Sequence, residues 1–242
     1  MKTRKGTVSA TTIRKELTTL GTVWAYAELG TFPNKGLTFP KSHEKPPFQT
    51  WQEIEAQIAA GADDELWGSL YLTIPEINQL LRHVKKSCPW PFMYPMLMMI
   101  AHTGARRSEL LRSQRTDFNS DTVIIHEKKR AKGRYTTRTI PMSKKLKTVM
   151  HEWLSLHEDQ STFGNLTVDQ TNHYFRCTMT GKWSNIRGWH TFRHSFASNC
   201  AAVGVDQRMI NTWMGHQTEE MMKRYQHLFP NDQKKAIDSV FK

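Results

Sequence analysis

Apolar residues recur every three or four positions along most of this chain, and that spacing predicts α-helices. Two later helix starts carry capping signals: Thr50 with Glu53 three positions on, and Thr73 with Pro75 in the first turn. The first predicted helix ends near Gly30. Its apolar stripe consists of Ile13, Leu17, Leu20, Val23, Trp24 and Ala27.

The middle of the chain changes its pattern twice. Residues 95–113 predict a buried helix, a break at Gly104 and a further helix that carries Leu110 and Leu111. Residues 121–141 contain β-branched runs on either side of a basic, glycine-containing centre, which predicts a hairpin with a charged tip. From residue 143 onward the spacing is helical again. The predicted fold class is therefore mainly α with a small antiparallel β-sheet.

A proline- and lysine-containing stretch at residues 33–48 predicts a linker. One helix cannot bury its own apolar face, so the part before the linker is interpreted as a piece of a helical domain or as a packing arm. We place the domain boundary after the linker and the helix that follows it. Residues 1–62 form the partial helical domain with its linker, and residues 63–242 form the main domain.

Charge narrows the possible partners. The chain has 34 Lys and Arg against 22 Asp and Glu, a net charge of +12, which favours a polyanion such as nucleic acid. No apolar run approaches the roughly 18 residues of a membrane span, and no signal sequence follows the basic start, so we expect a cytoplasmic protein without a membrane partner. Three cysteines without close spacing favour a reducing compartment.

Several residues that can bind a phosphate or react with it lie near predicted helix starts. Arg106 follows the break at Gly104, where a side chain and free N–H groups can reach an anion. His190 and Arg193 are three positions apart, so both can face one tetrahedral anion. Phosphoryl transfer without a metal needs arginines on the non-bridging oxygens and an acid for the leaving group. Tyr225 would be a modest nucleophile that needs a proton acceptor, and His190 is the candidate.

Other interpretations of the same residues are less well supported. His190 and His194 have the spacing of a metal pair, but no acidic residue lies between them and Cys200 is at the wrong distance, so we expect no metal and no cofactor. Residues 191–216 could be mistaken for a helix-turn-helix, but the second helix is too apolar for a DNA groove and is interpreted as core. Arg107 and Lys132 are assigned to DNA backbone contact at most.

The order of these motifs across residues 70–230 resembles the catalytic domain of tyrosine recombinases, DNA breaking-rejoining enzymes of the phage-integrase type. The motifs are TG-x-R at 103–106, the basic hairpin, H-x-x-R at 190–193, GH at 215–216 and a tyrosine nine residues later. The resemblance implies Arg106 and Arg193 as phosphate clamps, and His190 and His216 as donors or proton carriers. It implies Tyr225 as the nucleophile.

The family also has a hairpin lysine that protonates the leaving 5′ hydroxyl. We assign this role to Lys129, and Lys128 is nearly as suitable because the sequence does not fix the register of the hairpin. Glu109 resembles the acidic residue that orients the first arginine through a charge-assisted hydrogen bond.

The resemblance implies site-specific recombination, which integrates or excises a mobile element through a 3′-phosphotyrosyl intermediate without metal or nucleotide. The implied partners are double-stranded DNA, a homotetramer assembled on it and accessory DNA-bending proteins. A bacterial or phage-derived, nucleoid-associated protein is expected. The tail at residues 231–242, with Ile237, Val240 and Phe241 at helical spacing, is expected to dock on a neighbouring protomer.

The N-terminal part departs from the family pattern. Such integrases carry an arm-binding segment and a core-binding domain of several helices, whereas residues 1–62 resemble only the last one or two of those helices. A fragment, a truncated or decaying gene and a minimal natural form all remain open. Two other functions also remain: a DNA-binding remnant that does not cut, and a relaxing topoisomerase with the same chemistry.

Overall fold

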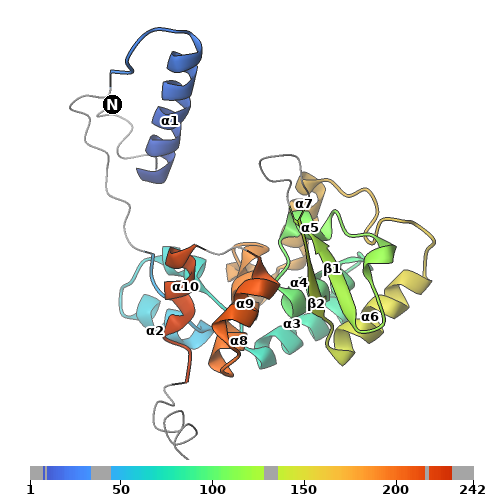
Figure 1. Cartoon of the computed structure of the whole chain (residues 1–242). Helices are drawn as coiled ribbons and strands as arrows, with labels where there is room; N and C mark the ends of the chain where they lie inside the picture. The colour runs from blue at the N-terminus through green and yellow to red at the C-terminus, as the bar shows by residue number, and fades with distance from the viewer. Residues whose placement is uncertain (1–7, 9, 34–44, 128–135, 216–217, 231–242) are drawn as a thin grey trace, which may run out of the picture. The chain divides into compact units, whose positions relative to one another are not determined.

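The computed structural model describes residues 8, 10–33, 45–127, 136–215 and 218–230. The chain divides into two compact units, Met1–Lys45 and Pro46–Lys242 (Figure 1). This division falls before the predicted boundary at 62/63. Helix α2 (Trp51–Ala59) lies in the larger unit, because Ile54 is fully buried in its core and Trp51 contacts Trp67 and Trp183.

The described part of the smaller unit contains helix α1 (Ala10–Tyr26). The predicted first helix is confirmed, although it ends at Tyr26 and not at Gly30. Several of its apolar residues remain exposed, including Val23 and Tyr26. Trp24 contacts Phe32 edge-on and donates to the Leu29 carbonyl, which closes the turn after the helix.

The larger unit is mainly helical. In the described part of this unit, three short 3₁₀ segments connect the longer elements: η1 (Asp64–Ser69), η2 (Arg115–Asp117) and η3 (Gly181–Asn185). Its further α-helices among the described residues are α3 (Ile74–Ser87), α4 (Met93–Thr103), α5 (Arg107–Leu110), α6 (Lys144–Ser155), α7 (Val168–Thr178), α8 (His190–Ala202), α9 (Gln207–Met214) and α10 (Glu219–Gln226).

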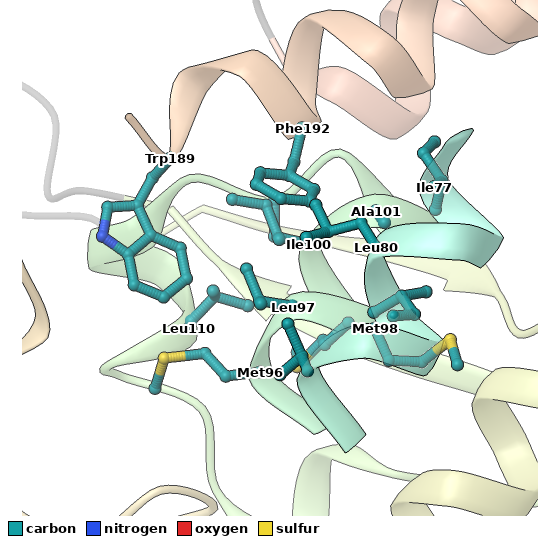
Figure 2. Packing of buried hydrophobic residues seen from close by; sticks show 14 of the residues in the cluster. Ile77, Leu80, Met96, Leu97, Met98, Ile100, Ala101, Leu110, Trp189 and Phe192 are labelled. Carbon is teal, nitrogen blue, oxygen red and sulfur yellow. The ribbon is translucent and has the colours of Figure 1, made fainter. Parts of the chain in front are cut away.

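Helix α4 forms the centre of the main core. It is apolar on all sides, as expected of a helix that other elements surround. Helices α3, α6 and α8 pack against it. Figure 2 shows Leu97 and Ile100 of α4 beneath Phe192 of α8, with Leu80 of α3 beside them. This packing fixes the end of α4 and the start of α8, the two places where the phosphate motifs lie.

The predicted helix starts at Thr50 and Thr73 are confirmed. In both, the backbone N–H of the threonine donates to a glutamate three residues on, at 2.7 Å to Glu53 and 2.7 Å to Glu76. Gly104 ends α4 as predicted, with a left-handed φ of +62°. A Cβ there would lie 2.5 Å from the sulfur of Met214 and 2.6 Å from the ring of Phe196, so only glycine fits.

The hairpin is confirmed as two antiparallel strands, β1 (Thr122–His126) and β2 (Thr137–Pro141). Strand β2 alternates exposed and buried residues, and Arg138 lies on the buried face with Ile140. In the register, Arg138 pairs with Ile125. A mainly helical unit with a small two-stranded sheet confirms the predicted fold class.

Across the described ranges, no helix combines the length and the apolar character that crossing a membrane requires.

Candidate active site

Four of the six predicted site residues are described, and they come from three elements of the larger unit. Arg106 precedes α5, His190 and Arg193 lie in the first turn of α8, and Tyr225 lies in the last turn of α10. Lys129, its alternative Lys128, and His216 lie outside the described residues.

Electrostatic effects show that these four side chains share one environment. The charge of Arg106 lowers the pKa of both His190 and Arg193. Tyr225, in contrast, acts to raise the pKa of Arg193. The fold therefore places Arg106, His190 and Tyr225 within electrostatic range of Arg193.

Arg106 is the N-cap residue of α5, and Glu109 holds it from two sides. The Arg106 backbone N–H donates to Glu109 Oε2 at 2.7 Å, and its Nη1 donates to Glu109 Oε1 at 2.8 Å. Glu109 is 1% exposed, whereas the side chain of Arg106 is 36% exposed. The predicted hydrogen bond from Arg106 to Glu109 is thus present, and it fixes an arginine that still reaches solvent.

Arg193 is buried and joins two segments. It donates through Nη1 to the carbonyl of Gly104 and through Nη2 to the carbonyl of Met214, at the ends of α4 and α9. Burial, followed by the charge of Arg106, lowers the pKa of Arg193. An anion placed beside Arg193 and Arg106 would therefore favour the charged form of Arg193.

His190 is open to solvent on one side, but its pKa is lowered. Partial desolvation is the largest cause, and the charges of Arg193, Arg107 and Arg106 add to it. The ring is therefore neutral near pH 7 and can accept a proton. Its ring centroid lies 6.1 Å from that of His194, which in turn stacks on Phe48 at 4.4 Å.

Tyr225 is 1% exposed and lies in a second apolar cluster, which we call the nucleophile cluster after the role that the sequence motifs imply for Tyr225. Its hydroxyl accepts a hydrogen bond from Gln207 Nε2 at 3.2 Å. The buried members of this cluster are Phe48, Tyr71, Ala197, Ala201, Ile210, Met214 and Tyr225.

Arg224, next to Tyr225, ties α10 to the first residues of the larger unit. Its guanidinium lies 3.9 Å from the centroid of the Phe48 ring, and its Nε donates to the Pro46 carbonyl at 2.8 Å. The Phe48 N–H donates to the Arg224 carbonyl at 2.8 Å. The proline pattern predicted a linker for Pro46 and Phe48 and gave them no part in the site.

Arg138 was not predicted from the sequence, yet it donates to Glu109 through Nη2 at 2.6 Å and through Nη1 at 3.2 Å. A signal was present, because the alternation of β2 places this charged residue on the inward face. Arg107, assigned to DNA contact at most, donates to Asn172 of α7.

Among the residues that the structure describes, no group of three or more His, Cys, Asp or Glu side chains is arranged to hold a metal ion. Two arginines, a neutral histidine and a tyrosine are groups that can bind a phosphodiester and transfer it to a hydroxyl.

A comparison with known proteins shows the family of the chain. The model of the phage integrase family matches residues 71–232. The chain therefore belongs to the phage integrase family.

The chain is similar to tyrosine recombinases from distant organisms. It is 26% identical over 180 residues to the tyrosine recombinase XerD of Chlorobaculum tepidum, covering 65% of this chain and 57% of that protein. It is also 26% identical over 158 residues to the tyrosine recombinase XerA of Pyrococcus horikoshii, covering 60% and 53%. The chain thus spans little more than half the length of these relatives.

Solved structures share its fold. The catalytic domain of bacteriophage HP1 integrase superposes with a TM-score of 0.52 at 21% identity, over 69% of this chain and 93% of that domain. The Tn1549 transposon integrase in complex with transposon right end DNA gives a TM-score of 0.65 at 14% identity, over 99% and 82%.

Proposed function

We propose that this protein is a site-specific DNA recombinase that cuts one strand by forming a covalent bond between Tyr225 and a DNA phosphate. The observation that carries the proposal is the pairing of Arg106 and Arg193. Arg106 is fixed by Glu109 and Arg193 by the Met214 carbonyl, and the charge of Arg106 and the buried Tyr225 both act on the pKa of Arg193.

In the proposed reaction, Arg106 and Arg193 bind the non-bridging oxygens of the scissile phosphate and stabilise the charge that grows on them. The Tyr225 oxygen forms a bond to phosphorus, and the bond from phosphorus to the 5′ oxygen breaks. His190, which is neutral near pH 7, takes the phenolic proton. Lys129 is proposed to donate a proton to the leaving 5′ oxygen. His216 is proposed to donate a further hydrogen bond to the phosphate.

The products are a 3′-phosphotyrosyl bond and a free 5′ hydroxyl. One phosphodiester is exchanged for another, so the reaction is reversible and needs no nucleotide to supply energy. Attack of a 5′ hydroxyl from another strand rejoins the DNA. Two such exchanges within a homotetramer on double-stranded DNA would integrate or excise a mobile element, with DNA-bending proteins as further partners.

Covalent capture in cells tests this proposal and identifies the DNA site in the same experiment. A tagged protein is expressed, the cells are lysed in denaturing detergent, and the DNA that stays attached to the purified protein is sequenced. We expect recovery of discrete junctions with the native chain and none with Tyr225→Phe. Tyr71→Phe is the matched control, because Tyr71 lies in the same nucleophile cluster.

A second candidate function is DNA binding without cleavage, and the burial of Tyr225 favours it. With 1% of the residue exposed, the hydroxyl cannot meet a phosphate unless α10 or the DNA rearranges the cluster. Reversible retention of DNA with no adduct from the native chain would support this second function and overturn the first. If the native protein and Tyr225→Phe formed equal amounts of covalent adduct, Tyr225 would not be the nucleophile.

A further inference from the structure

Arg138 is a buried guanidinium group that no motif of the chain explains. It occupies an inward position of β2, and its side chain is 6% exposed. Burying a guanidinium in a core is unfavourable unless its donors are all well satisfied. A residue of this kind at a core position therefore needs a reason beyond packing, and its contacts provide one.

The donors of Arg138 together reach three segments around the site. Its Nη2 donates to Glu109 Oε2 at 2.6 Å in α5, and Nη1 reaches Glu127 Oε1 at 3.3 Å, directly after β1. Its Nε donates to the Trp213 carbonyl at 2.6 Å, in the last turn of α9. One side chain thus connects the helix after Arg106, the strand that leads into the hairpin tip, and the end of α9.

The contact with Glu109 determines how Arg106 is held. A carboxylate has about four lone-pair positions, and four donors occupy those of Glu109. Two come from Arg138, one from the Arg106 backbone and one from the Arg106 side chain. Without Arg138, the buried Glu109 would have only Arg106 to neutralise it, and would draw that guanidinium away from a phosphate.

The contact with α9 fixes the segment that leads to residue 216. Arg138 and Arg193 take successive carbonyl oxygens, those of Trp213 and Met214. Gly215 then packs against the ion pair, because a Cβ there would lie 2.2 Å from Glu127 Oε1 and 3.3 Å from Arg138 Nη1. The glycine of the GH motif is thus seated on the pair that Arg138 forms with Glu127.

From these contacts we propose that Arg138 is a positioning residue for phosphate cleavage, which holds Arg106 through Glu109 and holds the approach to residue 216 through α9. This inference rests on the proposed function. Because the side chain of Arg138 is buried, we expect its loss to affect the rate of cleavage far more than the affinity for DNA.

The main test uses Arg138→Lys, which keeps the charge but cannot make the two-pronged contact with Glu109 and also reach Trp213. Arg115→Lys is the matched control, because Arg115 also donates to backbone carbonyls, those of Leu154 and His157, away from the site. The substrate is a duplex carrying the junction recovered by covalent capture. Adduct formation is measured in a single turnover, and DNA binding is measured by titration.

We expect Arg138→Lys to form adduct about 10- to 100-fold more slowly, with DNA affinity changed less than about threefold. A methylphosphonate at the scissile position removes the charge that Arg106 is proposed to bind. The deficit of Arg138→Lys should therefore shrink on that substrate, as it should for Arg106→Ala. A purely structural defect would slow cleavage of both substrates equally.

Two outcomes would overturn the inference: adduct formation by Arg138→Lys within about twofold of native, or an equal deficit on phosphate and methylphosphonate. A native chain that forms no adduct would count against the proposed function. In that case, a titration with orthovanadate decides the role of Arg138. Binding is measured from the arginine Nε–H signals in NMR spectra. Weaker vanadate binding in Arg138→Lys supports the inference, and unchanged binding overturns it.

Discussion

The arginines and the tyrosine of the candidate site are held by different physical means. Arg106 and Arg193 are fixed by directional hydrogen bonds to Glu109 and to backbone carbonyls. Tyr225 lies among the apolar side chains of the nucleophile cluster, and its hydroxyl accepts a hydrogen bond from Gln207.

This difference suggests which part moves when DNA binds. Directional hydrogen bonds to charged groups weaken steeply when the atoms shift, whereas apolar contact is non-directional and its free energy follows the area buried. We call Arg106 and Arg193 with their partners the phosphate side, and α10 with the nucleophile cluster the nucleophile side. We expect the phosphate side to keep its geometry and α10 to adjust until Tyr225 meets the phosphate. Separate substitutions on the two sides can test this expectation.

The largest effect is expected on the phosphate side, from Glu109→Gln. It removes the nearer of the two carboxylates that the buried Arg138 contacts, and breaking a buried ion pair costs about 3–5 kcal/mol of unfolding free energy. Urea unfolding measures this loss. Glu53→Gln, the same change in an exposed capping box, should cost about 1 kcal/mol or less. A loss below about 1 kcal/mol for Glu109→Gln would show that the network is not a rigid support.

The pH dependence sharpens this prediction. Burial alone would raise the pKa of Glu109, but hydrogen bonds and charge from Arg138, and then from Arg106, lower it below 4.5 overall. A lowered pKa in the folded state contributes stability above pH 4.5, which is lost as the pH falls through the folded-state value. The melting temperature of Glu109→Gln should thus fall less over this acid range than that of the native chain.

A smaller effect is expected on the nucleophile side, from Phe48→Leu. The change removes the contact of Phe48 with Arg224 and its stacking on His194, which together contribute about 1–2 kcal/mol. Hydrogen exchange should rise in α10 and stay unchanged in α5. Phe163→Leu is the control, since Phe163 is buried in the main core. Faster exchange in both helices would contradict the separation of the two sides.

Much of the fold was predictable because it is encoded locally. Helix spacing, the capping boxes at Thr50 and Thr73, and the glycine break at Gly104 each depend on residues within a few positions of one another. The same holds for the placement of Arg106 and of His190 with Arg193, since each lies at a helix start that the sequence marks.

The supports of the site were harder to predict, because they join residues far apart in the chain. Phe48 was assigned to a linker on account of nearby prolines, but it packs between His194 and Arg224. No local pattern encodes those partners. Arg138 could have been found, since strand alternation gives it an inward position, but its partners Glu109 and Trp213 follow only from the tertiary fold.

The smallest effect is expected from Gln207→Leu, which removes the hydrogen bond to the Tyr225 hydroxyl. If α10 must adjust before attack, this bond is lost on the way to the reaction. A neutral hydrogen bond contributes about 0.5–1.5 kcal/mol, so cleavage should become about 2- to 10-fold faster. Single-turnover adduct formation measures the rate, and a double-mutant cycle with Tyr225→Phe measures the coupling in urea unfolding. An unchanged or slower rate would mean that Tyr225 attacks with Gln207 still bound, and that the tyrosine is already positioned before DNA arrives.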